Sequence, residues 1–201
     1  MPITYWGMNV AIAAKDYNER AVRQHWHQRC DPTLSFTEPS CRDLLSIWRT
    51  KASGRKMPIR SQMTPRDLKG YLKNIVLGQR EEANPSRYRF RLIGTGLTEI
   101  VGEHTGQRFE DSIPAEHLPR WIEVCDMILE SEQPWRFLGR VHIRGREYLN
   151  AENLYMPLAD EDGVPSFVMG YCRYTPRFAV NDIDMEAELE NEIASIPGGL
   201  L

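Results

Sequence analysis

The segment RYRFRLIGTGLTEIVGEHTG, residues 87–106, has the spacing that comes nearest to a phosphate-binding turn. A dinucleotide site needs G-x-G-x-x-G between a strand and a helix, so that backbone N–H groups meet the pyrophosphate. Gly94 and Gly96 fit this pattern, but Glu99 replaces the third glycine and would place a carboxylate beside the phosphates. We therefore expect these glycines to let the chain turn sharply off a strand.

Residues that could bind a metal are poorly spaced for it. His25 and His27, close to Cys30, would point about 200° apart on a helix, unlike the i, i+4 pair that a helical metal site requires. The four cysteines, at positions 30, 41, 125 and 172, form no C-x-x-C pair, which is typical of buried, reduced thiols. We predict neither a metal site nor a disulfide.

Two polar side chains interrupt the otherwise apolar segment EYLNAENLYMPL, residues 147–158. Asn150 and Glu152 share one face of the predicted strand, and they are the polar groups best suited to a cavity. The alternative is that this face meets solvent. The sequence shows no paired acid and base elsewhere, so we predict no catalytic residues.

The elements before the first predicted strand have weak patterns. Residues 16–29 have helical propensity without a continuous apolar face, so they form an appended helix or a loose arm, and residues 30–40 are typical of a linker. The apolar spacing over 44–48 indicates a helix. A second helix start is predicted by a capping box from Thr64 to Asp67.

From residue 74 the pattern changes to strands. NIVLGQRE and the alternating residues 87–92 predict a hairpin, followed by a short helix near 97–101 and an apolar helical stripe over 118–129. The segments WRFLGRVHIR, EYLNAENLYMPL and SFVMGYCRYT, joined by turn-rich links, predict an antiparallel meander. This order predicts an α+β fold with one antiparallel sheet covered on one face by the intervening helices.

The composition of the chain excludes some classes of protein. With 201 residues, 41% of them hydrophobic, it can bury one sizeable core. The net charge of -3 argues against nucleic-acid binding, which needs a cationic surface. No apolar run is long enough to span a membrane and the start lacks a signal-peptide pattern, so we expect a cytoplasmic protein.

The order of elements, together with the segments RLIGT, TGQRFED and LYMPLADEDG, resembles the PAS domain. The preceding residues, from IWRTKASGRK onwards, resemble the extended front half of a single-domain bacterial PAS family known mainly from alphaproteobacteria. The resemblance covers residues 44–174. It implies a five-stranded antiparallel sheet in the order 2-1-5-4-3, with helices on one face and flanking N- and C-terminal helices, and it implies no catalytic residues.

The resemblance suggests a division of the chain and a binding space. Residues 1–40 would be an N-terminal arm or helix and linker, 41–176 the PAS-like domain with its leading helices, and 177–201 an acidic C-terminal helix or tail. The space between sheet and helices would be lined by Phe90, Leu92, Trp121, Cys125, Phe137, Met156, Met169 and Tyr171, with Asn150 and Glu152 as its polar groups. Such large side chains also suit an ordinary core, because burying each contributes about 1.5–3 kcal/mol.

PAS-like proteins that bind a flavin or a haem have characteristic residues, and this sequence lacks them. A flavin photosensor of this type needs a reactive cysteine in an NCRFLQ-like helix, and the corresponding GLTEIVG has none, while Cys125 lies on an apolar helical stripe. A haem sensor needs an axial imidazole, and His104, in a loop, and His117, before a helix start, are not well placed for it. We predict no bound haem or flavin and leave open an uncoloured metabolite.

Charged residues are unevenly distributed. Arginines share faces of two strands that the PAS-like order places at opposite sheet edges: Arg87, Arg89 and Arg91 on one, and Arg136, Arg140 and Arg144, with His142, on the other. Charges there prevent edge-to-edge pairing, or they form a docking surface for an acidic partner. Residues 182–192 carry six acidic and no basic side chains, so this segment is a solvated end or a helix that docks on its own or a second subunit.

The leading hypothesis is a PAS-like regulatory module that signals by changing its contacts with a partner protein in trans, with or without a small ligand in its core. PAS-like proteins commonly pair through flanking helices, which suggests a homodimer. The alternative is a small cone-shaped α+β enzyme in which Glu152 or His142 acts as a base.

Overall fold

The computed structural model describes residues 10–81, 84–141 and 149–176. In chain order its elements are α1 (Val10–Arg23), β1 (Gln28–Asp31), α2 (Pro39–Ala52), the short 3-10 helices η1 (Arg60–Gln62) and η2 (Leu72–Asn74), β2 (Ile75–Glu81), β3 (Asn84–Ile93), α3 (Thr95–Val101), α4 (Phe109–Ser112), α5 (Leu118–Ser131), β4 (Trp135–Arg140), β5 (Leu149–Ala159) and β6 (Pro165–Pro176). This arrangement confirms the predicted α+β fold class.

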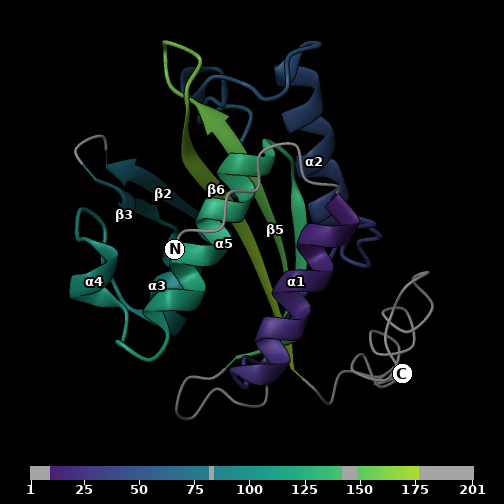
Figure 1. The fold of residues 1–201 in the computed structure, drawn as a ribbon. Helices are drawn as coiled ribbons and strands as arrows, with labels where there is room; N and C mark the ends of the chain where they lie inside the picture. The colour runs from purple at the N-terminus through teal and green to yellow at the C-terminus, as the bar shows by residue number, and fades with distance from the viewer. Residues whose placement is uncertain (1–9, 82–83, 142–148, 177–201) are drawn as a thin grey trace.

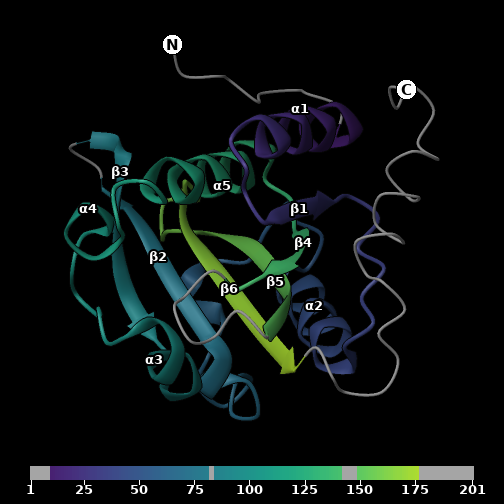
Figure 2. The ribbon, with the colours of Figure 1, turned by 90° about the horizontal axis from the view of Figure 1, so that it is seen from below.

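The strands form one antiparallel sheet in the order β1-β4-β5-β6-β2-β3. Without β1, this is the order that the PAS resemblance implies. Figure 1 labels β2, β3, β5 and β6, and Figure 2 labels β1 and β4 as well. The sheet has six strands rather than five because Gln28–Asp31 pairs with β4, beyond the expected edge. The segment was expected to belong partly to a helix or arm and partly to a linker.

Helix α1 supports the additional strand. Asn18 donates from Nδ2 to the carbonyl oxygen of Cys30 (2.8 Å) and accepts at Oδ1 from the Cys30 backbone N–H (2.7 Å), so its amide takes the place of a neighbouring strand. The buried face of α1 consists of small residues around one aromatic ring, Tyr17. A face built mainly from alanine gives little hydrophobic periodicity, which explains why the sequence left open whether this segment is a helix or a loose arm.

Helices cover both faces of the sheet. Figure 2 shows α1 and α5 on one side of the strands and α2 on the other. The buried residues accordingly form two large clusters, one beneath α1 and α5 that includes Trp135 and Phe137, and one beneath α2 that includes Leu154 and Met156. The sequence analysis predicted that the intervening helices cover one face of the sheet. In the structure, α2 and the segment after it cover the second face. Strand β5 is therefore buried on both sides.

The predicted second helix start is formed only locally. The Thr64 N–H donates to Asp67 Oδ2 (3.2 Å), and the Asp67 N–H donates to Thr64 Oγ1 (3.4 Å), as in a capping box. Residues after Pro65 nevertheless form successive turns and then η2, rather than a regular helix. Gly70 lies within this stretch, and glycine weakens a helix interior by about 1 kcal/mol.

Several expectations concern parts of the chain outside the described residues. The acidic segment 182–192, together with His142 and Arg144, belongs to these parts. Within the described ranges, none of the helices has the length and apolar character needed to cross a bilayer.

Candidate ligand-binding cavity

A cavity of about 520 Å³ lies between the sheet and the segment from α3 to α5. Its volume is within the range of about 300–1,000 Å³ that is usual for small-molecule sites. Its walls are mainly apolar. The apolar lining residues come from β2, β3, β5, α3, α5, the loop before α5 and the residue after β4: Val76, Phe90, Ile93, Leu97, Ile100, Val101, Ile113, Pro114, Trp121, Val141, Ala151 and Tyr155.

The cavity exists at this place because β5 and β6 present small or polar side chains there. The cavity-facing residues of β5 alternate along the strand as Ala151, Asn153 and Tyr155, and they pair with Tyr174, Cys172 and Gly170 of β6. A side chain at Gly170 would collide with the Tyr155 ring, so the glycine leaves room for that ring. The phenol of Tyr155 then lies 3.7 Å from Cys172 Sγ.

Asn153 is the unsatisfied polar group of the cavity. Its side chain lies on the central part of the sheet and the residue is only 6% exposed. Its Oδ1 is fully buried and has no hydrogen-bond partner. Leaving a buried acceptor unpaired costs about 1–3 kcal/mol, so this oxygen calls for a donor from a ligand or an ordered water.

The thiol and the two phenols nearest to Asn153 on β5 and β6 are neutral at physiological pH. Burial raises the pKa of the Cys172 thiol to about 11, and it raises the pKa of the Tyr155 and Tyr174 phenols well above their ordinary value. Because a thiolate rather than a thiol is the nucleophile, Cys172 is not set up to form a covalent adduct. The site can bind a ligand through complementary shape and hydrogen bonds, and none of these three side chains supplies a base.

Two histidines that the sequence analysis judged poorly placed for haem do line the cavity. The ring nitrogens of His104 lie 3.0 Å from the carbonyl oxygen of Val101, the last residue of α3, and 3.3 Å from Oε1 of Gln107 in the same loop. His117 stands immediately before α5. In the part of the chain that is described, no three metal-binding side chains come together. The prediction that no haem is bound stays a prediction.

The candidate lining residues divide between the two faces of the sheet. Phe90 and Trp121 line the cavity. Cys125 and Phe137 belong to the same core cluster but do not reach the cavity. The remaining apolar candidates pack in the cluster beneath α2, on the opposite face: Leu92, Met156, Met169 and Tyr171.

A β-bulge separates Phe90 from Leu92. Leu77 of β2 pairs with Leu92, but the next residue, Gly78, pairs with Phe90, so Arg91 is an extra residue on β3. A bulge of this kind reverses the alternation of side chains along a strand. Two residues that strict alternation places on one face therefore point to opposite faces.

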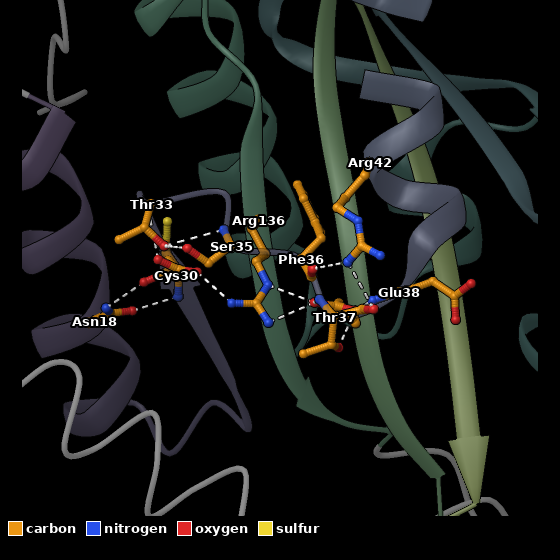
Figure 3. Close-up of polar contacts among 11 residues, drawn as sticks. Asn18, Cys30, Thr33, Ser35, Phe36, Thr37, Glu38, Arg42 and Arg136 are labelled. Atoms are coloured by element: carbon orange, nitrogen blue, oxygen red, sulfur yellow. Dashed lines mark hydrogen bonds and ion pairs between the residues drawn. The ribbon is translucent and has the colours of Figure 1, made fainter. Parts of the chain in front are cut away.

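Glu152 also lies on the face away from the cavity, where it holds the start of α2. Its carboxylate accepts from the Thr37 N–H (3.0 Å), the Thr37 hydroxyl (2.8 Å) and the Glu38 N–H (2.8 Å), and it contacts the Arg136 guanidinium at 2.7 Å. Figure 3 labels these three partners, Thr37, Glu38 and Arg136. Arg136 binds Asp31 at 2.6 Å as well. With four donors on its two oxygens, Glu152 is a structural anchor and is not free to act as a base. Asn150, which lies two residues before Glu152 on the same strand, is half-buried and does not line the cavity either.

The arginines on β4 were expected at a sheet edge, but β4 is not an edge strand. Because β1 covers this edge, Arg136 is 4% exposed and completes a buried ion triad with Asp31 and Glu152. On β3, which is at the other edge, Arg89 pairs with Glu81, and Arg87 pairs with Glu110. The two edges therefore do not carry equivalent cationic faces.

The sequence analysis missed the polar residues that the cavity does contain. Asn153, Cys172 and Tyr174 lie in strands whose two faces are both buried, so alternation does not tell which face meets the cavity. Asn153 could have been found as the amide within the run NLYMPL. Arg120 gives no sequence signal, because it lies beside the apolar stripe of α5 and enters the lining only through the packing of that helix.

Comparisons with known proteins agree with this architecture. The sequence model of a family described as PAS domain matches residues 36–173, which is more than half of the chain. No curated protein matches the sequence.

Solved structures with similar folds include a light-oxygen-voltage domain studied with a flavin analogue, at 17% identity and a TM-score of 0.41, covering 63% of this chain and 91% of that one. An RNA-binding light-oxygen-voltage receptor has 13% identity and a TM-score of 0.40; 70% of this chain aligns, over only 40% of that receptor. A sensory box histidine kinase/response regulator from Burkholderia thailandensis E264 has 13% identity and a TM-score of 0.37, covering 65% and 97%.

Proposed function

The chain belongs to the PAS domain family, and from that premise we propose that it is a sensory module whose cavity binds a small ligand. The observation that carries the proposal is a cavity of about 520 Å³ that is lined by Asn153, a residue whose buried Oδ1 lacks a hydrogen-bond partner. An apolar cavity without such a group is explained by imperfect packing alone. A cavity with an unpaired acceptor on a central strand is better suited to a ligand that supplies the donor.

Ligand binding can be passed to the surface through β1. Gln28 of this strand lines the cavity, and the Tyr17 hydroxyl of α1 donates to Gln28 Oε1 (3.2 Å). Helix α1 in turn exposes Ile12 and Val22, which are 51% and 59% exposed. We propose that occupation of the cavity changes the position of β1 and α1, and that a partner protein senses this change.

The proposal is tested by native mass spectrometry of the protein purified from its own host, with an absorption spectrum of the same sample. We expect a stoichiometric bound mass without a visible chromophore. A protein that carries no bound mass when its fold is intact contradicts the proposal. A Soret or flavin absorption band would show that the bound molecule is a coloured cofactor and not an uncoloured ligand.

A pair of variants assigns the bound mass to the cavity. Ile100→Trp places a large ring on a half-buried lining position, whereas Val164→Trp makes a similar change on the exposed turn between β5 and β6. The first variant should lose the bound mass and the second should retain it. Equal retention by both would place the ligand elsewhere.

The alternative was an enzyme with Glu152 or His142 as its base; His142 lies outside the described residues, and Glu152 does not have the setting of a base. The carboxylate is saturated with donors and lies on the sheet face opposite the cavity. PAS domains are in general sensory modules rather than enzymes, and the family membership favours the same conclusion.

A further inference from the structure

The charged side chains around the cavity are predominantly basic. Arg120, from the first turn of α5, and Arg140, at the end of β4, both contribute to its lining. Among the described lining residues, Glu116 is the one carboxylate, and it is exposed. A cavity with this balance favours an anionic ligand over a neutral or cationic one.

Arg120 is the better defined of the two arginines. It is half-buried, its guanidinium carbon lies 6.0 Å from the centroid of the Trp121 ring, and its charge acts on the Tyr174 phenol. Within the described residues no carboxylate forms an ion pair with it. A guanidinium binds a carboxylate through two parallel N–H donors, and its place in the first turn of a helix adds a favourable dipole for the anion.

Aromatic rings form part of the cavity wall. Trp121 and Tyr155 meet edge to face with centroids 6.4 Å apart, and Phe90 lines the same cavity. Rings arranged in this way offer faces and edges to a flat ligand. The apolar part of the ligand is therefore best filled by an aromatic ring system.

The sheet register gives the spacing of the backbone positions on the sheet side of the cavity. Asn153 pairs with Cys172 and Ala151 pairs with Tyr174, so Asn153 and Tyr174 occupy register positions two residues apart along the strands. Two residues correspond to roughly 7 Å. This is the scale of a one- or two-ring aromatic acid.

We propose that the cavity binds an aromatic carboxylate whose ring carries an N–H or O–H group. The carboxylate meets Arg120, the ring lies among Phe90, Trp121 and Tyr155, and the ring donor meets Asn153 Oδ1. This inference rests on the proposed ligand-binding function and adds the chemical class of the ligand.

Three probes separate the two polar contacts. Indole-3-acetate has both the ring N–H and the carboxylate, indole-3-acetamide replaces the carboxylate with a neutral amide of the same shape, and naphthalene-1-acetate keeps the carboxylate without the ring N–H. By isothermal titration calorimetry the full-length protein should bind indole-3-acetate about tenfold or more tightly than the amide, since hydrogen bonds to charged groups contribute that much. It should bind indole-3-acetate about fivefold or more tightly than the naphthalene acid.

Two variants should each remove one preference. Arg120→Gln should abolish the preference for the acid over the amide and retain the preference for the indole over naphthalene. Asn153→Leu should do the reverse. Arg66→Gln, an exposed arginine away from the cavity, is the matched control and should keep both preferences. Because Asn153 is buried in β5, the wild-type comparison and Arg120→Gln test the proposal even if Asn153→Leu does not fold.

Equal affinity for acid and amide, preferences unchanged in Arg120→Gln, or no binding of any probe would overturn the proposed class. A neutral metabolite found by native mass spectrometry would overturn it as well while supporting the ligand-binding function. A protein that carries no bound mass and binds no probe would overturn both.

Discussion

Single buried charges decide how the N-terminal part is attached to the sheet. Glu152 joins three segments through one carboxylate, because it accepts from the turn before α2 and from Arg136, which in turn binds Asp31 of β1. All three charged residues are less than 9% exposed. Removing one partner of such a group leaves another buried charge incompletely paired.

We therefore expect Glu152→Gln to lower the free energy of unfolding by about 3–5 kcal/mol, the range found when a buried ion pair loses one member. Urea denaturation followed by circular dichroism measures the effect. Glu161→Gln, an exposed residue of the β5–β6 turn, is the control and should change stability by less than about 0.5 kcal/mol. Similar midpoints for the two variants would show that the triad does not anchor the fold.

The cysteines provide a second prediction at the level of residues. All four are free and buried. Burial raises the pKa of Cys172 to about 11 and raises the pKa of Cys30, Cys41 and Cys125 as well, so little thiolate is present at pH 8. Ellman's reagent should titrate close to no thiols in the native protein and four after unfolding in urea. Fast stoichiometric reaction of one thiol in the native state would contradict the neutral, buried setting of these groups.

At the level of elements, β1 depends on a close approach to β4. Gly139 faces β1, and a Cβ atom there would collide with the His27 carbonyl oxygen and lie 2.9 Å from Gln28 Cα. Both neighbours are backbone atoms, so the strand itself would have to move. The same region contributes His27, Gln28 and Gly139 to the cavity.

We expect Gly139→Ala to destabilise the protein by about 1–3 kcal/mol, the usual cost of overpacking, and to increase hydrogen exchange in β1 and α1. Gly70→Ala is the control, because a Cβ atom at Gly70 would have no neighbour within 4 Å. Hydrogen exchange read by mass spectrometry measures both variants. Unchanged protection of β1 in Gly139→Ala would mean that the strand is not held as described.

Some helices and strands could be predicted from their sequence patterns, and others could not. The stripe over 118–129 predicted α5, because it reflects burial of one helix face. The alternation over 87–92 predicted β3, although its apolar side chains lie on both faces of the sheet. Strand β1 was missed because four residues, QRCD, have no alternation and depend on Asn18 of α1 for an edge partner.

The faces of the sheet were harder to predict than its strands. Burial of β5 on both sides hides which residues meet the cavity, and the bulge at Arg91 separates Phe90 from Leu92. Glu152 and Asn153 are adjacent, so their side chains point to opposite faces of the sheet. Which of the two belongs to the candidate site therefore depends on which face meets the cavity. Alternation defines two faces of a strand but gives no information on what covers each of them.

At the level of the whole molecule, charge segregation makes a prediction for residues 182–196, which lie outside the described part of the chain. Six acidic side chains within 182–192 repel one another in an isolated helix, and a cationic surface would relieve that repulsion. Exposed ion pairs contribute only about 0–1 kcal/mol each, so contacts of Leu189 and Ile193 must supply much of any docking energy.

Truncation after Asn181 should accordingly lower the melting temperature or dissociate an oligomer, and more strongly at low salt than at high salt, because salt screens exposed charges. Differential scanning fluorimetry and light scattering at both salt concentrations measure this. A truncated protein that equals the full chain in both properties would identify the segment as a solvated end.

The central claim is that the cavity between the sheet and α3–α5 holds a small ligand. The most direct test is a high-resolution crystal structure of the protein purified from its own host without added ligand. We predict electron density for a small molecule among Phe90, Trp121 and Tyr155, with a donor atom within hydrogen-bond distance of Asn153 Oδ1. A cavity that contains only water, or that is filled by the protein's own side chains, would contradict the account.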